Sequence, residues 1–200
     1  MDRKEEIIYA TLELASEYGL RAVSMQQIAD KVGIRKASVY NHFKSREEIV
    51  EAMYQFLRQK SSEANGVQDF DMEDLLNSYS LKQILMMVVG NYQKMSTAPE
   101  MYMFYKITMS ERSLDKSAAE IMVTETKKMI QATTVLFYAL QAKKLVNIQN
   151  IESAAMAFAM GIHSIIDYEC DIKQIGQTDD KNLLEKYIDE FCYMYGSKEE

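Results

Sequence analysis

The spacing of apolar residues along the chain predicts a succession of helices. Between residues 3 and 18 apolar side chains recur at helical intervals, as Ile8, Leu12 and Ala15 do, and Gly19 then provides an end signal. No stretch shows the sustained alternation of apolar and polar residues that a half-buried strand requires. We therefore expect an all-α protein of about nine helices.

The stretch from Ser24 to Phe43 is predicted to form two short helices joined by a tight turn. Ser24 and Gln27 have the spacing of a capping box, in which each side chain bonds a backbone amide of the other residue. Gly33 suits the left-handed conformation that ends a helix. A second helix is then expected from about residue 36 to residue 42, with a short, polar and basic outer face.

The remaining helices follow from apolar stripes and end signals. Ser45 and Glu48 form a second capping box, which starts a helix that runs to near Ser62. The segment Glu63–Phe70 contains Asn-Gly and is the clearest loop, so we place the domain boundary between residues 61 and 62. Further helices are expected at about 71 or 72 to 95, 100 to 109, 117 to 145, 150 to 172 and 178 to 195.

Composition and charge narrow the class of protein. A chain of 200 residues with 48% apolar content can bury a sizeable core, which excludes general disorder. The net charge of −7 at first argues against a nucleic-acid partner. However, the window from Arg21 to Arg46 carries six Lys or Arg residues against one Asp. A basic tip on an acidic body favours docking on DNA through that tip alone.

Other features of the sequence exclude some classes of function. Cys170 and Cys192 are too few and too far apart for a disulfide scaffold or a metal cluster, and we assign them no role. No apolar run approaches the roughly 18 residues of a membrane span, and the N-terminal residues are charged. We expect a cytoplasmic protein with no membrane partner, no metal and no cofactor.

About the first sixty residues resemble the DNA-binding domain of the TetR (tetracycline repressor) family of bacterial transcription regulators. The resemblance rests on residue types at fixed spacings: Ser24, Ile28-Ala29, Val32-Gly33-Ile34, Tyr40, His42-Phe43 and Arg46-Glu47-Glu48. Two positions depart from the pattern, because the family usually has Ser where Arg35 stands and Lys where Arg46 stands. Arg35 loses a helix cap but adds a guanidinium group, while Arg46 keeps the charge for a phosphate.

The resemblance implies a helix-turn-helix DNA-binding domain at residues 1–61, with its motif at 24–43, and a helical ligand-binding and dimerisation domain at residues 62–200. The second helix of the motif would enter the major groove, where Arg35, Lys36, Ala37, Ser38 and Asn41 would meet base edges. Phosphate contacts would come from Ser24, Gln27, Tyr40, His42, Lys44 and Arg46. The alternatives are an ordinary helical hairpin and, for His42 alone, a local packing role.

DNA binding of this kind requires two copies of the chain. One short helix buries too little surface for tight specific binding, so a homodimer on a palindromic operator is expected, with half-sites about one turn apart. The last two helices carry enough apolar surface for the interface, and the candidate residues are Ala154, Ala157, Phe158, Gly161, Ile165, Leu184, Ile188 and Phe191. The alternative is that these residues form a wholly intramolecular core.

The middle helices are rich in Met, Tyr and Phe, which suits a small apolar or aromatic effector. The candidate ligand-binding residues are Met86, Tyr92, Tyr102, Phe104, Tyr105, Met122, Met129, Phe137, Tyr138 and His163. The alternative is that most of them are core residues. His163, one turn from Asp167, could equally be a satisfied core histidine.

The sequence therefore predicts a homodimeric repressor that an unknown small molecule releases from its operator. A second hypothesis keeps the DNA-binding head but makes the protein an adaptor or nucleoid-associated protein controlled by a protein partner. An enzyme is the weakest hypothesis, since the sequence lacks a Gly-rich phosphate loop and a nucleophile with a placed His and carboxylate. Neither the effector, the operator nor the direction of regulation follows from the sequence.

Overall fold

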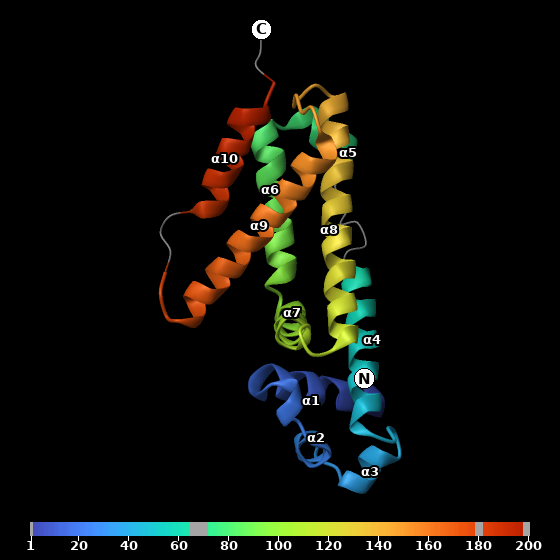
Figure 1. The fold of residues 1–200 in the computed structure, drawn as a ribbon. Helices are drawn as coiled ribbons and strands as arrows, with labels where there is room; N and C mark the ends of the chain where they lie inside the picture. The colour runs from blue at the N-terminus through green and yellow to red at the C-terminus, as the bar shows by residue number, and fades with distance from the viewer. Residues whose placement is uncertain (1, 65–71, 179–181, 198–200) are drawn as a thin grey trace. The chain divides into compact units, whose positions relative to one another are not determined.

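A computed structural model of the chain describes residues 2–64, 72–178 and 182–197. In this part the chain is helical, and the only extended pairing is an isolated bridge between Val146 and Gly196 (Figure 1). The prediction of an all-α protein is confirmed. The helices are α1 (Arg3–Tyr18), the 3-10 helix η1 (Leu20–Ala22), α2 (Met25–Val32), α3 (Lys36–Tyr40), α4 (Arg46–Ala64), α5 (Met72–Ser78), α6 (Leu81–Ser96), α7 (Pro99–Glu111), α8 (Lys116–Ala142), α9 (Ile151–Gln174) and α10 (Leu183–Tyr195).

The single helix expected from residue 71 or 72 to residue 95 is two helices, α5 and α6. The break lies at Ser80, which caps the start of α6. Its backbone N–H donates to Gln83 Oε1 at 2.9 Å, and its Oγ accepts from the Gln83 N–H at 3.4 Å. This is a capping box that was not predicted from the sequence. The apolar stripe continues through Leu81 and Leu85 on the far side of the break, which is why periodicity alone joined the two helices.

Two other expected boundaries differ or lie beyond the description. Glu63 and Ala64, placed in the loop by sequence, belong to the last turn of α4, and the rest of that loop lies outside the described residues. Residues 179–181 of the last predicted helix also lie outside them. The helix α10 begins at Leu183, after Asn182 in a left-handed conformation with a φ of 46°.

The chain packs as two compact units. The N-terminal unit comprises residues 1–68 and 95–124, and the C-terminal unit comprises residues 69–94 and 125–200, each as far as the structure describes them. This division by packing differs from the functional boundary expected at residues 61 and 62. The difference arises because α7 packs on α1 and α4, the helices that flank the predicted DNA-binding motif in the sequence.

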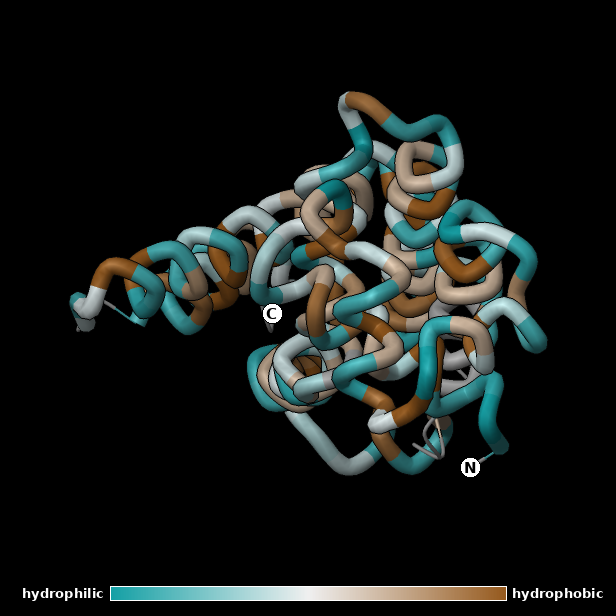
Figure 2. Tube along the Cα trace, turned by 90° about the horizontal axis from the view of Figure 1, so that it is seen from below, coloured by the Kyte–Doolittle hydropathy of each residue, from teal (hydrophilic) through white to brown (hydrophobic). Residues whose placement is uncertain are grey.

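The core of the N-terminal unit joins α1, α2, α3, α4 and α7. Ile7, Ile28 and Val39 have no exposed surface, and Phe104 and Ile107 of α7 pack in the same cluster. Figure 1 shows α1 between α7 on one side and α2 and α3 on the other. Figure 2 shows apolar and polar residues interspersed along the helical turns, as expected for amphipathic helices.

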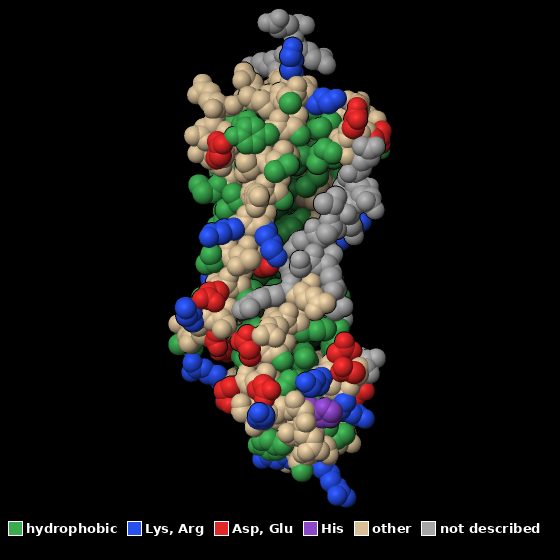
Figure 3. Space-filling view, turned by 90° about the vertical axis from the view of Figure 1, so that its right-hand side faces the viewer, with side chains coloured by type: hydrophobic (Ala, Val, Ile, Leu, Met, Phe, Trp, Pro, Cys, Tyr) green, Lys and Arg blue, Asp and Glu red, His purple; other side chains and the backbone are tan. Residues whose placement is uncertain are grey.

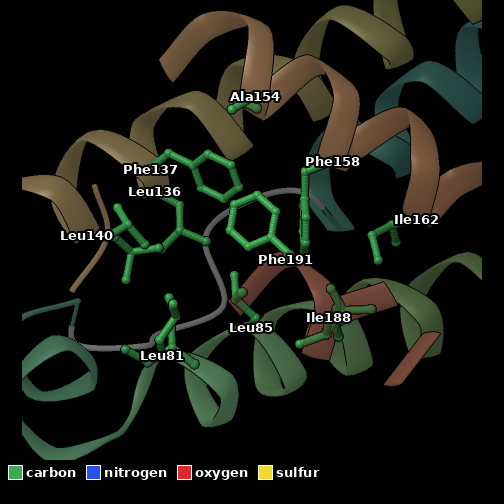
Figure 4. Close-up of a cluster of buried hydrophobic side chains, with 14 of the residues drawn as sticks. Leu81, Leu85, Leu136, Phe137, Leu140, Ala154, Phe158, Ile162, Ile188 and Phe191 are labelled. Carbon is green, nitrogen blue, oxygen red and sulfur yellow. The ribbon is translucent and has the colours of Figure 1, made fainter. Parts of the chain in front are cut away.

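The core of the C-terminal unit is built around three aromatic rings. Phe191 of α10 lies with its ring centroid 5.0 Å from that of Phe137 and 4.8 Å from that of Phe158. Figure 4 shows these rings facing one another among aliphatic side chains from α6, α8 and α9. Lys82 of α6 forms ion pairs with two carboxylates of α10, with Nζ 2.7 Å from Asp189 Oδ1 and 3.1 Å from Glu185 Oε1.

Close approach of α9 and α10 depends on Gly161. The Tyr187 hydroxyl of α10 donates to the carbonyl oxygen of Ala157 at 3.1 Å and lies where a side chain at residue 161 would start. Any larger residue at position 161 would have to displace that ring. In the described part of the chain, none of the helices is both long and apolar enough to cross a membrane.

Candidate nucleic-acid interface

The start of α2 is held by local hydrogen bonds, and a glycine ends the helix. The Gln27 side-chain oxygen accepts from the Ser24 N–H at 2.9 Å, and Ser24 Oγ accepts from the Gln27 N–H at 3.3 Å. Gly33 ends α2 in the left-handed conformation, with a φ of 74°. Both sequence predictions for this motif are confirmed. The Ser24 and Gln27 side chains therefore already serve the helix cap, and a phosphate contact from either would share that role.

The helix α3 is shorter than expected, since it ends at Tyr40 rather than at His42. The backbone still continues in a helical turn, because the N–H groups of His42 and Phe43 both donate to the Val39 carbonyl oxygen at 3.0 Å. Arg35 precedes the helix and its side chain makes no capping hydrogen bond, as the exchange of Ser for Arg implied. Val39 is fully buried and anchors the helix to the core.

The outward face of α3 contains the residues that the sequence analysis assigned to DNA. Ser38 and His42 are half-buried, while the exposed residues are Arg35, Lys36, Ala37, Tyr40 and Asn41. In the part of the chain that the structure describes, the Arg35, Lys36 and Lys44 side chains form no ion pair. Lys and Arg side chains gather around a histidine beside this helical hairpin in Figure 3.

Three of the six basic residues in the window 21–46 contact other parts of the protein: Lys31, Arg21 and Arg46. Lys31 Nζ lies 2.7 Å from Glu13 Oε2, and this contact raises the pKa of the Lys31 ammonium. Arg21 Nε lies 3.9 Å from Glu111 Oε2 of α7. Because these charges have carboxylate partners, the positive charge available to DNA is smaller than the sequence count indicated.

Arg46 has a structural role that the sequence analysis did not identify. Its Nε donates to the Val23 carbonyl oxygen at 2.7 Å, and its Nη2 donates to the Leu20 carbonyl oxygen. These bonds attach the first residue of α4 to the first residue of η1 and to the residue that follows η1, just before α2. The phosphate contact expected for Arg46 therefore competes with two bonds inside the protein, and only its remaining donors can face DNA.

The start of α4 is capped differently from the capping box that was predicted. Ser45 Oγ accepts from the Glu48 N–H at 3.2 Å, as expected. The Glu48 carboxylate, however, accepts from the Lys44 N–H at 2.6 Å rather than from the Ser45 N–H. This fixes the backbone at Lys44 while its side chain remains exposed.

The candidate effector residues are divided between the two units. Tyr102, Phe104, Tyr105 and Met122 belong to the N-terminal unit, and the others belong to the C-terminal unit. Phe104 and Phe137 are buried in the two separate cores, as the core alternative predicted for them. Met86 and Tyr138 are exposed, and the Tyr138 hydroxyl donates to the Glu152 carboxylate. Tyr105, Met122 and Met129 are half-buried.

Among the candidates, Tyr92 and His163 make a direct polar contact. The Tyr92 hydroxyl lies 3.1 Å from His163 Nδ1, and His163 Nε2 lies 3.9 Å from Asp167 Oδ2. Burial raises the pKa of Tyr92 to about 12, and the negative charges of Asp167 and Glu125 act in the same direction. The hydroxyl thus stays protonated at neutral pH. A hydrogen-bonded histidine is what the core alternative predicted, so a ligand role for His163 stays a hypothesis.

The candidate interface residues on α9 and α10 divide by burial. Phe158, Leu184, Ile188 and Phe191 are buried in the core of their own unit, as the intramolecular alternative predicted, and their place in a dimer interface stays a prediction. Ala154 is nearly buried, Gly161 and Ile165 are half-buried, and Ala157 is exposed. The same helices expose Met156, Met160 and Met194. An open groove of about 100 Å³ lies between the two helices, lined by Ala154, Ala157, Phe158, Tyr187, Glu190, Phe191, Met194 and Tyr195.

The cysteines and acidic residues show no second site. Burial raises the pKa of both the Cys170 and the Cys192 thiols, which disfavours the reactive thiolate. Within residues 2–64, 72–178 and 182–197, no group of three or more His, Cys, Asp or Glu side chains is placed to hold a metal ion.

Comparison with known sequences bears on the N-terminal unit. Residues 7–53 match the family model described as "Bacterial regulatory proteins, tetR family". The HTH-type transcriptional repressor KstR2 of Mycolicibacterium smegmatis is 39% identical over 49 residues, which are 24% of this chain and 24% of that protein. The nucleoid occlusion factor SlmA of Vibrio cholerae is 30% identical over 89 residues, or 44% of this chain and 45% of that protein. The chain thus matches less than half of the length of either relative.

Comparison with solved structures bears on the whole chain. A TetR-family regulator from Mesorhizobium loti has a TM-score of 0.68 at 17% identity, over 98% of this chain and 100% of that chain. A transcriptional regulator from Saccharomonospora viridis, solved in complex with choline, has a TM-score of 0.69 at 14% identity, over 98% of each chain. At these identities the likeness shows the fold. Residues 7–53 therefore form a domain of the tetR family of bacterial regulatory proteins, and over nearly its whole length the chain shares the fold of these solved regulators.

Proposed function

We propose that this regulator is a homodimeric repressor that binds a palindromic operator through α3 and leaves it when a small apolar or aromatic molecule binds. The observation that carries the proposal is the outward face of α3. There Arg35, Lys36 and Asn41 are exposed on a helix that a capped turn and the buried Val39 hold in position.

Base recognition follows from the donors and acceptors on this face. Arg35 and Lys36 suit the O6 and N7 acceptors of guanine, and Asn41 suits the N6 and N7 pair of adenine. Ala37 suits a thymine methyl group. Phosphates would be held by Tyr40, His42 and Lys44, with Ser24, Gln27 and the remaining donors of Arg46 as further contacts. These contacts set the register of the protein on DNA without reading sequence.

The size of α3 supports a dimer. A recognition helix of five residues offers less surface than specific binding needs, so two copies must bind together. The exposed residues Met156, Ala157, Met160 and Met194 on α9 and α10 give each copy an apolar face, and the groove between these helices could receive side chains of a second copy. A two-fold dimer would place two α3 helices on half-sites about one turn apart.

Control by an effector is proposed from the polar pair in the C-terminal unit, from α8, which belongs to both units, and from the packing of α7. Tyr92 and His163 are the candidate hydrogen-bonding groups for the effector. Met86 and Met129 are apolar candidates in the same unit. The helix α8 is continuous through both units, and α7 packs directly on α1 and α4. A ligand needs only to favour one spacing of the two α3 helices, and a coupling of about 1–3 kcal/mol is typical.

A second candidate function is control by a protein partner. The match to the nucleoid occlusion factor SlmA covers 44% of this chain, whereas the match to the repressor KstR2 covers 24%. In this case the protein would still bind DNA, but no small molecule would release it.

The test is selection of DNA fragments from a random or genomic pool by the purified chain. We expect a palindrome with half-sites about one turn apart, and tight binding of the selected site. Lys36→Ala or Asn41→Ala should weaken that binding while the dimer persists, with Lys106→Ala on α7 as the matched control. Selected fragments without a palindrome, or unchanged affinity in both α3 variants, would contradict the assignment. Screening molecules for release then separates small-molecule control from partner control.

A further inference from the structure

We propose that Lys4, in the first turn of α1, is a DNA-backbone contact that extends the binding surface beyond the helix-turn-helix motif. The inference rests on the proposed function, because it adds a phosphate contact to the same DNA complex. Lys4 lies 20 residues before the motif, so no motif spacing in the sequence points to it.

The position of Lys4 is given by its contact with Phe43. The Lys4 ammonium nitrogen lies 5.8 Å from the centroid of the Phe43 ring. Phe43 is the residue directly after His42 and directly before Lys44, both of which are assigned to phosphates. The folded chain thus brings a third basic or protonatable side chain to the backbone stretch that leaves α3.

The charges around Lys4 leave its ammonium group available. The neighbouring carboxylates have other partners, since Glu5 Oε2 accepts from the Asp2 N–H at 3.1 Å and Glu6 Oε2 lies 2.5 Å from Arg3 Nη1. In the described part of the chain Lys4 is exposed and forms no ion pair. Its ammonium group makes a cation–π contact with the Phe43 ring. A cation held over an aromatic face keeps its charge and its outward donors.

This lysine compensates for basic residues that the fold uses elsewhere. Lys31 pairs with Glu13, Arg21 lies beside Glu111, and Arg46 bonds two carbonyl oxygens. Among the described residues near the start of α4, Lys44 and Lys4 are exposed cations that form no ion pair. Lys4 therefore adds to the sequence-independent attraction at the edge of the motif.

A phosphate contact and a purely structural contact predict different measurements. Neutralising one phosphate contact lowers the salt dependence of binding by about 0.9 in the slope of log K against log salt concentration, hence by about 1.8 for two subunits. It weakens binding to specific and unrelated DNA alike. If Lys4 only packs on Phe43, its removal lowers stability and leaves the salt slope unchanged.

The experiment compares Lys4→Met, Lys4→Arg and the control Lys106→Met, which makes the same charge change on α7, across α1 from α3 (Figure 1). Affinity for the selected operator is measured from 50 to 200 mM salt. We expect Lys4→Met to make the fall in affinity over this range about tenfold smaller, whereas Lys4→Arg and Lys106→Met keep the slope of the unaltered protein. An unchanged slope in Lys4→Met, with the unaltered protein still binding its operator, would overturn the inference. Failure of the unaltered protein to bind any selected site would instead overturn the proposed function.

Discussion

Sequence patterns predicted the structure of the N-terminal unit more fully than that of the C-terminal unit. In the N-terminal unit the capping box at Ser24 and the left-handed Gly33 act within a few residues, so the sequence predicted both correctly. In the C-terminal unit the apolar stripes predicted helices but not their partners. Phe191, expected at a dimer interface, lies instead between Phe137 and Phe158 of the same chain. Features that depend on a few neighbouring residues can be predicted from the sequence, whereas the packing partners of a helix cannot.

The largest expected effect tests the assignment of Phe191 to the core. Phe191 is 4% exposed, and Met194, one turn later on the same helix, is 57% exposed. Phe191→Ala should lower the free energy of unfolding by about 3–5 kcal/mol, because it removes a buried ring and leaves a cavity. Met194→Ala should change that free energy little but weaken the proposed dimer. Denaturant unfolding and sedimentation of both variants provide the measurements, and equal destabilisation by the two would contradict the division by burial.

The next effect separates Arg46 from Lys44 in the N-terminal unit. Arg46→Met removes the Arg46 donors from the Val23 and Leu20 carbonyl oxygens, of which the Leu20 oxygen still accepts from the Val23 N–H at 3.3 Å. The loss should cost about 1–3 kcal/mol of unfolding free energy. Lys44→Met removes an exposed charge near the same turn, so it should weaken DNA binding with little loss of stability. Chemical denaturation and DNA titration are run on both variants. If Arg46→Met unfolds like the unaltered chain, Arg46 serves DNA rather than the fold.

The smallest effect concerns the polar pair of the C-terminal unit. The pKa of Tyr92 is raised to about 12 in the folded chain, so the unfolded chain releases this proton first as the pH rises above 10. The free energy of unfolding should therefore fall between pH 10 and pH 12, and part of this fall should vanish in Tyr92→Phe. Denaturation at a series of pH values measures the difference. Identical pH profiles would show that Tyr92 is not protected from ionisation in the folded state.

The outcome at particular residues shows why some site predictions could not be made in full. Arg35 was expected to lack a capping bond, and this was predictable because a cap is a contact between neighbours in sequence. The contact of Arg46 with Leu20 and Val23 was not predictable, since it joins residues more than 20 positions apart. The break at Ser80 had a local signal in Gln83, which the continuous apolar stripe obscured.

The sequence by itself determined the all-α class, most helix boundaries, the helix-turn-helix motif and the residues on the outer face of α3. These features depend on hydrogen bonds and periodicities that span a few residues, so the chain encodes them locally. Only the tertiary structure decided which basic residues remain available to DNA, that α7 packs with the DNA-binding helices, and that Lys4 lies beside Phe43. Such contacts depend on how distant segments bury their apolar faces together, which no local pattern specifies.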